Sequence, residues 1–121
     1  MHYIGVDIIE IARIERAIAR WEGSFLHRVY TDLELKLCRK KPSSLAARFA
    51  AKEAVIKAIG TQTKGIGWRE IEILAEPDGK PLVHLYGKAQ TQADSLGLGQ
   101  FAISLSHSKE YAVAFVVGET K

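Results

Sequence analysis

The sequence predicts an α+β fold in which antiparallel strands pack with one long central helix. Apolar, strand-like runs occur near both ends of the chain, and an alanine-rich run without glycine or proline occupies residues 45–59. The chain has 121 residues, of which 47% are hydrophobic, enough for one modest core. No repeat, linker or low-complexity tract divides it, so we expect a single domain over residues 1–121.

The chain is predicted to begin with a strand and to continue as a helix. Residues 3–9 are β-branched and apolar with one charge near their end, which is typical of a buried strand. Apolar residues at helical spacing follow over residues 11–21, and Gly23 is placed to end that helix. Residues 25–30 should form a short helical or irregular link.

Two further helices are expected before residue 60. Thr31 and Glu34 have the spacing of a capping box, so a helix should begin at residue 32 and run to about residue 40. The run Pro42-Ser43-Ser44 interrupts it and should supply the next N-cap. The alanine-rich residues 45–59 form the clearest helix of the chain.

Shorter elements are predicted in the C-terminal half, where turn residues separate strand-like runs. They are, in order, a loop at residues 60–67, a strand at 69–75, a turn at 77–80, a strand at 81–86, a helix at 88–95, a glycine-rich stop at 97–99, and strands at 101–106 and 111–117.

Positive charge is concentrated in the N-terminal half. The chain carries 17 Lys and Arg against 14 Asp and Glu, a net charge of +3. Residues 1–60 hold 11 basic and 7 acidic side chains, a net charge of +4, whereas residues 61–121 hold 6 and 7, a net charge of −1. An anionic partner should therefore meet the N-terminal half first. A small chain often shares its substrate cleft with a neighbouring subunit, so we also expect an oligomer.

The single cysteine fits a reducing compartment, and the lack of long apolar segments argues against a membrane span. Cys38 is the only cysteine, which excludes an intrachain disulfide and a thiolate zinc site. Residues 1–7 lack the features of a secretory signal, and no apolar run reaches the roughly eighteen residues of a membrane span. We therefore expect a cytoplasmic protein.

Asp7 lies near the end of the first apolar run, where a carboxylate must be solvated, paired or bound to a cation. By the two-residue period of a strand it shares one side with Tyr3 and Gly5, and Gly5 leaves room beside it. The alternative is that Asp7 caps the helix that follows, since Asp is a favoured N-cap residue.

Glu53 and Lys57 fall on the small, apolar face of the predicted helix at residues 45–59. Their i,i+4 spacing also suits an ordinary helix ion pair, worth only about 0.2–0.5 kcal/mol. That alternative is weakened because the opposite side, with Arg48 and Lys52, is available for solvated charge. A charge among alanine and phenylalanine side chains needs a specific reason.

Asp7 and Glu53 together supply two hard oxygen ligands, and no His or Cys spacing suits zinc. Such a pair fits Mg²⁺, which takes one or two protein carboxylates and completes its coordination with water and substrate phosphate oxygens. A phosphate-bearing substrate is therefore implied, and the loop at residues 60–67 could offer backbone N–H groups to it. This loop lacks the Gly-Lys-Ser/Thr ending of a P-loop.

Four blocks of sequence resemble the small, acyl-carrier-protein-synthase type of 4′-phosphopantetheinyl transferase. They are residues 4–8 (IGVDI) with Arg13 and Ile14, residues 48–60 (RFAAKEAVIKAIG), residues 78–81 (DGKP) and residues 104–112 (SLSHSKEYA). They occur in the order of the family and cover nearly the whole chain. Larger, two-lobed relatives carry a second acid two residues after the first. This sequence has Ile9 there, which places it with the small type.

The resemblance implies a homotrimer of small α+β subunits with active sites between them. It implies transfer of the 4′-phosphopantetheine group from coenzyme A to a serine of an acidic apo-acyl carrier protein, in support of fatty acid biosynthesis. Mg²⁺ is expected at Asp7 and Glu53. Lys57 and Glu53 are the expected catalytic residues, with Lys57 as an electrostatic clamp; a metal-activated water, Glu53 or Lys57 could accept the serine proton. The expected contacts of coenzyme A are Arg48, Lys57, Gly60, Lys64, Gly65, His107 and Ser108.

A row of arginines marks the predicted docking surface for the carrier. Arg13, Arg16 and Arg20 lie on one stripe of the first predicted helix, opposite its isoleucines. The alternative is an ordinary solvated helix face. By resemblance, Arg13, Arg20, Phe25 and Arg28 match positions that bind the carrier, and Arg16 has weaker support.

Three other functions are considered from the sequence. The basic N-terminal half would suit a small RNA-binding module, but no aromatic-interleaved basic motif occurs and only 8% of residues are aromatic. A trimeric interaction protein that has lost its activity would not need Asp7, Glu53 and Lys57. Another magnesium-dependent phosphotransferase is the closest alternative.

Trp21 and Trp68 are expected in the core or at an interface.

Overall fold

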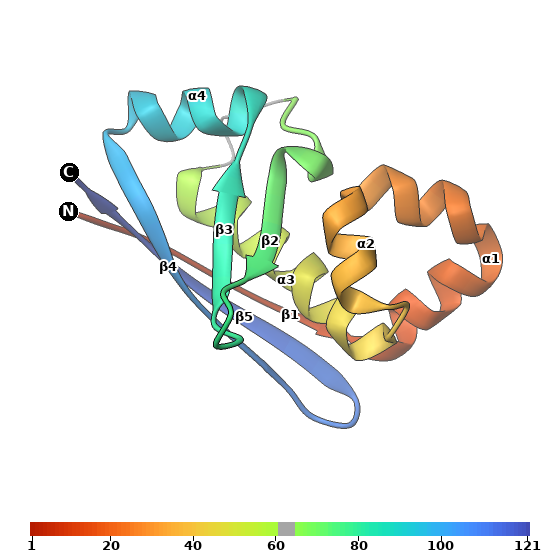
Figure 1. Ribbon diagram of the computed structural model, residues 1–121. Helices are drawn as coiled ribbons and strands as arrows, with labels where there is room; N and C mark the ends of the chain where they lie inside the picture. Colours follow the sequence, from red (N-terminus) through yellow and green to blue (C-terminus); the bar gives the residue numbers. More distant parts are fainter. Residues whose placement is uncertain (61–64) are drawn as a thin grey trace.

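The computed structural model describes residues 1–60 and 65–121 (Figure 1). Its elements are, in order, β1 (His2–Glu10), α1 (Ile11–Val29), α2 (Asp32–Cys38), α3 (Pro42–Ile59), the 3-10 helix η1 (Trp68–Glu70), β2 (Ile71–Ala75), β3 (Pro81–Leu85), α4 (Gly87–Ser95), β4 (Leu98–His107) and β5 (Tyr111–Thr120). The predicted α+β class is confirmed, and Lys64 lies outside the described residues. None of the helices in the described ranges is long and apolar enough to cross a membrane.

Two antiparallel sheets organise the strands. β1, β5 and β4 form a three-stranded sheet with β5 in the middle, and β2 and β3 form a hairpin. β1 pairs with β5 over its whole length, from His2 opposite Glu119 to Glu10 opposite Tyr111. The two ends of the chain therefore lie side by side (Figure 1).

Helix α3 packs very closely on one face of the three-stranded sheet, mainly against β1 and β5. Small buried residues line this contact, among them Ala54 of α3 and Ala112 and Ala114 of β5. A Cβ atom at Gly5 in β1 would overlap the backbone carbonyl oxygen of Ala54. Only glycine allows this approach, which brings the neighbouring Asp7 alongside α3.

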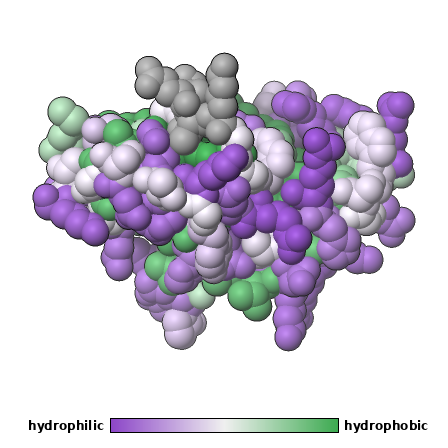
Figure 2. All heavy atoms as spheres, turned by 90° about the horizontal axis from the view of Figure 1, so that it is seen from above, coloured by the Kyte–Doolittle hydropathy of each residue, from purple (hydrophilic) through white to green (hydrophobic). Residues whose placement is uncertain are grey.

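The opposite face of the three-stranded sheet carries exposed apolar side chains. Ile4, Val6 and Ile8 alternate with the inward-facing residues of β1 and are 58%, 51% and 63% exposed. Tyr111 and Phe115 of β5 lie on the same face and are also exposed. The prediction of a buried first strand is therefore correct for one face only. By contrast, hydrophilic residues predominate on the face of the molecule shown in Figure 2.

The first helix continues further than predicted. Its backbone breaks at Glu22, which has φ 37° and ψ −110°, one residue before the expected end at Gly23. Helical geometry then resumes and extends to Val29, so the predicted link is helical. Figure 1 shows the bend that this break produces in α1.

The capping box of α2 is confirmed, whereas the N-cap predicted for α3 is wrong. Thr31 Oγ1 accepts a hydrogen bond from the Glu34 backbone N–H at 3.2 Å, and Glu34 Oε1 accepts one from the Thr31 N–H at 2.9 Å. The N-cap of α3 is Lys41, because Pro42 itself occupies the first turn. Proline suits that position, since its φ is already helical and its missing N–H would have no partner there.

The strand predicted from residue 69 begins two residues later, at Ile71, because Trp68–Glu70 form η1. The Glu70 carboxylate stabilises this turn by accepting a hydrogen bond from the backbone N–H of Gly67 at 3.2 Å. It also accepts one from the N–H of Ala89 in α4 at 3.0 Å. Glu70 therefore joins the segment after α3 to the start of α4.

Lys52 of α3 is fully buried, which corrects the prediction that it lies on a solvated side. Its ammonium donates to Glu34 Oε1 at 2.7 Å, to the carbonyl oxygen of Trp68 at 3.1 Å and to that of Ile71. Burial lowers the pKa of Lys52, and the Glu34 carboxylate partly opposes this shift. Glu34 also accepts a hydrogen bond from the Ile73 N–H at 2.8 Å. These bonds fix α3 relative to α2 and β2.

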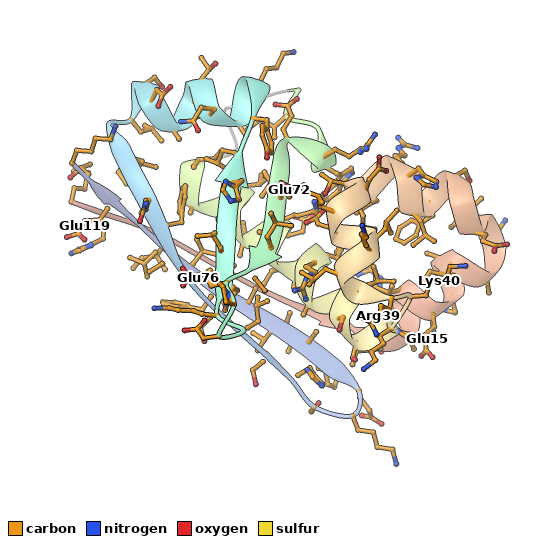
Figure 3. All side chains as sticks on the ribbon, viewed as in Figure 1. Glu15, Arg39, Lys40, Glu72, Glu76 and Glu119 are labelled. Carbon is orange, nitrogen blue, oxygen red and sulfur yellow. The ribbon has the colours of Figure 1, made fainter. Side chains whose placement is uncertain are left out.

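Glu72 of β2 extends the polar contacts between α2 and the hairpin (Figure 3). Its carboxylate accepts hydrogen bonds from Thr31 Oγ1 at 2.6 Å and from the Tyr86 hydroxyl at 2.8 Å. The bond to Glu72, and burial to a lesser degree, raise the pKa of Tyr86. The hairpin is thus held to α2 by side-chain hydrogen bonds as well as by apolar contacts.

Candidate active site between β1 and α3

Asp7 lies in β1 on the face that packs against α3. Its backbone is paired with Ala114 of β5, and its side chain is 17% exposed. The N-cap of α1 is Glu10, whose side chain makes no capping hydrogen bond. The alternative that Asp7 caps this helix is therefore wrong. A partly buried carboxylate on a rigid strand is favoured by a compensating positive charge.

Lys57 of α3 supplies such a charge. Its Nζ donates to Asp7 Oδ1 at 2.9 Å and to the backbone carbonyl oxygen of Val6 at 3.2 Å. Its side chain is 51% exposed. The ammonium thus reaches from the helix to the strand, rather than back along the helix to Glu53 as the i,i+4 alternative requires.

Glu53 is half-buried one helical turn before Lys57. Burial raises its pKa and the negative charge of Asp7 raises it further, while the charges of Lys57 and Arg13 act in the opposite direction. The contribution of Asp7 means that the two carboxylates are close enough to repel each other. A cation held by both would relieve this repulsion.

The donors of Asp7 and Glu53 fit a hard divalent cation. Within residues 1–60 and 65–121, no group of three or more His, Cys, Asp or Glu side chains is placed to hold a metal. A metal here would take two carboxylates from the chain and its other ligands from water and substrate, a pattern that Mg²⁺ accepts. We refer to Asp7, Glu53 and Lys57 as the carboxylate–lysine cluster.

The other residues predicted to contact coenzyme A fall into two groups. Gly60 and Gly65 follow α3, with positive φ angles of 99° and 91°. His107 and Ser108 lie at the β4–β5 turn, where the Ser108 N–H donates to the carbonyl oxygen of Tyr111 at 2.8 Å. Figure 1 shows this turn at one end of the three-stranded sheet and the C-terminal end of α3 toward the other. Among the described residues of one chain, the two groups therefore lie apart.

Arg48 lies on α3 but is directed away from the carboxylate–lysine cluster. Burial raises the pKa values of Tyr30 and Cys38, and the positive charge of Arg48 partly opposes both shifts. Its Nε is buried and has no hydrogen-bond partner among the described residues. A buried, unpaired guanidinium nitrogen is a position where a water molecule or ligand atom would bind.

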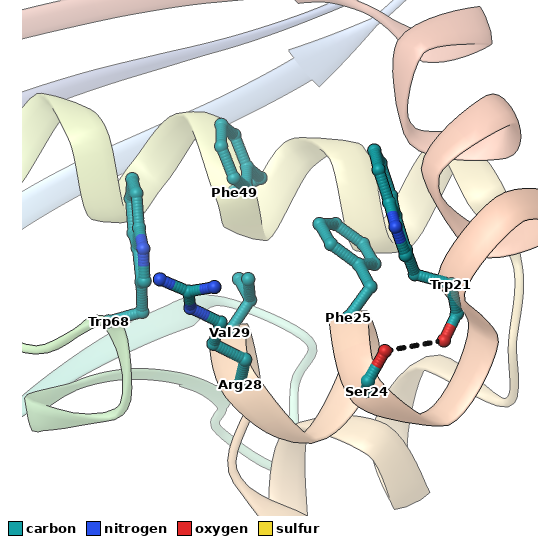
Figure 4. A pocket seen from close by; sticks show the side chains of 7 residues that line it. All are labelled: Trp21, Ser24, Phe25, Arg28, Val29, Phe49 and Trp68. Atoms are coloured by element: carbon teal, nitrogen blue, oxygen red, sulfur yellow. Dashed lines mark hydrogen bonds between the residues drawn. The ribbon is translucent and has the colours of Figure 1, made fainter.

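Aromatic residues form a cavity near the predicted carrier-docking residues. It has a volume of about 430 Å³ and is lined by Trp21, Ser24, Phe25, Arg28, Val29, Phe49 and Trp68 (Figure 4). Phe49 and Trp68 stack with their ring centroids 5.0 Å apart. Neither Phe49 nor Ser24 was predicted to line a docking surface; for Phe49 the reason is that no spacing pattern links α1 to α3.

The arginine stripe of α1 adjoins this cavity. Arg13, Arg16 and Arg20 line a second hollow of about 350 Å³ together with Ala17 and Trp21. The Arg20 guanidinium lies 4.9 Å from the centre of the Trp21 ring. Because Trp21 lines both hollows, the predicted docking residues form one continuous surface along α1.

The chain is similar in sequence and in fold to known proteins. A model of the 4′-phosphopantetheinyl transferase superfamily matches residues 3–116, so the chain belongs to this superfamily. The holo-acyl-carrier-protein synthase of Dehalococcoides mccartyi is 55% identical and aligns over 98% of this chain and 99% of its own. That of Herpetosiphon aurantiacus is 51% identical over 94% and 95%. A crystal structure of Helicobacter pylori holo-acyl-carrier-protein synthase in complex with coenzyme A has a TM-score of 0.82 and 34% identity, over 96% of this chain and 99% of that chain.

Proposed function

We propose that this chain transfers the 4′-phosphopantetheine group from coenzyme A to a serine of apo-acyl carrier protein and releases adenosine 3′,5′-bisphosphate. The observation that carries this proposal is the carboxylate–lysine cluster, in which two carboxylates and an ammonium from different elements meet at one place. The names of the relatives and the coenzyme A in the Helicobacter pylori structure support the choice of substrates. The family role in fatty acid biosynthesis is part of the same proposal.

In the proposed reaction, the serine Oγ attacks the phosphorus on the pantetheine side of the pyrophosphate. The new O–P bond forms as the bond from this phosphorus to the bridging oxygen breaks, and the departing nucleotide keeps the electron pair. The Lys57 ammonium stabilises negative charge on the phosphate oxygens. The serine proton passes to Glu53 or to a water molecule beside it.

The proposal includes Mg²⁺, which Asp7 and Glu53 would hold. When bound, the ion supplies Lewis-acid neutralisation of the pyrophosphate charge. Asp7 is fixed in a paired strand and Glu53 in a helix that Gly5 brings close to that strand. The two ligands are thus positioned relative to each other before any substrate binds.

We also propose that the active unit is a homotrimer. The exposed apolar face of the three-stranded sheet supports burial against another copy. The distance between the β4–β5 turn and the end of α3 in Figure 1 supports a coenzyme site shared by two subunits. The number three comes from the family resemblance.

The acidic carrier is proposed to dock along α1, on the surface that runs from Arg13 to the aromatic cavity. Arginine and aromatic side chains are the types enriched at protein interfaces, and this surface presents both. The guanidinium groups would pair with carrier carboxylates, while Phe25 and its aromatic neighbours would receive an apolar side chain.

The direct test of the proposed function is mass spectrometry of an acidic apo-carrier incubated with this protein, coenzyme A and Mg²⁺. We expect one phosphopantetheine group on one serine, with stoichiometric release of adenosine 3′,5′-bisphosphate. Replacing that serine with alanine in the carrier provides the control. A carrier that stays unmodified while a known transferase modifies it would refute the proposal.

A further inference from the structure

Lys57 and a divalent cation would both bind the carboxylate of Asp7. The Nζ of Lys57 lies 2.9 Å from Asp7 Oδ1, so the ammonium is the direct counter-ion of a carboxylate assigned above to metal binding. We propose that the two cations exchange at Asp7: Lys57 leaves this carboxylate as the divalent cation binds, and the released ammonium then meets a phosphate oxygen of coenzyme A. This inference rests on the proposed function and adds an order of events to it.

The environment of Lys57 allows this movement. Half of the side chain is exposed, and its other hydrogen bond to a described residue is the longer one, 3.2 Å, to the carbonyl oxygen of Val6. Lys52, five residues earlier on α3, shows the opposite arrangement, since it is fully buried and donates to three oxygen atoms. Asp7 is held in a paired strand. The ammonium of Lys57 can therefore move away from Asp7.

The balance of charge favours exchange over simultaneous binding. Two carboxylates and one ammonium give the cluster a net charge of −1 when all are ionised, and a divalent cation would reverse it to +1. An ammonium and a dication on the same carboxylate repel each other, and this repulsion is strong in a partly buried site. The negative pyrophosphate of bound coenzyme A would offer the displaced ammonium a new partner.

Removing the ammonium should therefore strengthen cation binding. Mn²⁺ prefers the same oxygen ligands as Mg²⁺, and electron paramagnetic resonance counts the free ion in a titration without coenzyme or carrier. Lys57→Met should bind Mn²⁺ roughly fivefold more tightly than the unaltered chain, as expected for the loss of one exposed competing ion pair.

Arg13→Met is the matched control. Arg13 acts on Glu53 through its charge, and no ion pair with Asp7 is found for it among the described residues. This substitution should change the affinity for Mn²⁺ by less than about twofold, because an exposed charge at a distance is screened. Equal effects of the two substitutions would indicate a general field and would overturn the exchange.

The position of the ammonium can also be followed directly by nuclear magnetic resonance of the lysine side chains. The Lys57→Met variant identifies the Lys57 signal. Titration of the unaltered chain with Mg²⁺ should move this signal to the position that it already has in Asp7→Asn, in which Mg²⁺ should no longer move it. A Lys57 signal that is unchanged at saturation with Mg²⁺ would contradict the exchange.

The exchange can fail separately from the metal site that belongs to the proposed function. If Asp7→Asn and Glu53→Gln bind Mn²⁺ as tightly as the unaltered chain, the metal site is wrong and the exchange is wrong with it. If both variants lose Mn²⁺ while Lys57→Met binds it no more tightly than Arg13→Met, the metal site stands and only the exchange is refuted.

Discussion

Asp7 and Glu53 belong to different elements, β1 and α3, and their carboxylates lie close enough to interact. Asp7 stands on a strand that is paired along its length, and Glu53 stands on a helix that small residues allow close to that strand. Neither carboxylate is needed for packing, and each is only partly buried. Their removal should therefore affect chemistry more than folding.

We predict that Asp7→Ala lowers turnover by more than about a hundredfold, because it removes a carboxylate that we propose as a ligand of the charge-stabilising cation. Its melting temperature should stay close to that of the unaltered chain, since the lost ion pair is exposed and worth at most about 1 kcal/mol. Glu10→Ala, which removes an exposed carboxylate at the end of the same strand, is the control and should retain activity. Turnover near the original value in Asp7→Ala would remove this residue from the site.

Glu53→Gln should stabilise the chain at neutral pH when a chelator keeps divalent cations away. Because the pKa of Glu53 is raised in the folded state, its favourable contribution is present below the unfolded pKa, about 4.3, and is lost as pH rises through the folded pKa. Thermal unfolding at pH 7 should therefore show a higher melting temperature for the variant. The difference should shrink toward pH 4, and a lower melting temperature at pH 7 would contradict the assignment.

At the scale of elements, the start of α2 could be predicted from neighbouring residues, but the buried face of α3 depends on residues that are distant in the sequence. The capping box of α2 is local and was predictable from two residues, Thr31 and Glu34. The burial of Lys52 could not be predicted in this way. Its partner Glu34 lies 18 residues away, and both side chains face a strand that follows α3. The sequence likewise placed Asp7, Glu53 and Lys57 on candidate surfaces. Their meeting at one point depends on the packing of β1 on α3 at Gly5.

The Lys52–Glu34 pair should be the most sensitive polar contact of α3. Lys52→Met leaves the Glu34 carboxylate buried without its cation, which we expect to lower the free energy of unfolding by about 3–5 kcal/mol. Lys57→Met, the same substitution on the exposed side of α3, should change it by about 1 kcal/mol or less. Urea denaturation of both variants tests this contrast, which equal losses would contradict.

Charge reversal on α1 tests the docking surface. Arg13→Glu should raise KM for the carrier at least about tenfold, while the KM for coenzyme A changes little, because an interface charge acts on encounter and register. Lys36→Glu on α2 makes the same change of charge at another exposed position and serves as the control. The KM for the carrier should also rise with ionic strength. If both variants behave alike, the arginine stripe is only a solvated helix face.

For the whole molecule, the exposed sheet face is the feature that a single chain leaves unexplained. We expect the chain to sediment as a trimer, and Val6→Lys to sediment as a monomer with normal helix content and lost activity, because a charge would be buried in the interface. Val6 lies directly opposite the exposed Phe115, so Phe115→Lys should act in the same way. A monomer that remains active at high dilution would refute a shared site.

The pairing of β1 with β5 also determines when during synthesis the site can form. β1 is translated first, but its partner β5 is the last strand of the described chain. The pair between His2 and Glu119 can therefore form only after Glu119 has been added. Contacts within α3 are local and can form early, whereas a contact between such distant segments forms slowly. We therefore expect Glu53 and Lys57 to occupy their helix before Asp7 is fixed beside them. A nascent chain that has not yet added β5 would hold Glu53 and Lys57 on α3 while Asp7 lacks its strand pairing.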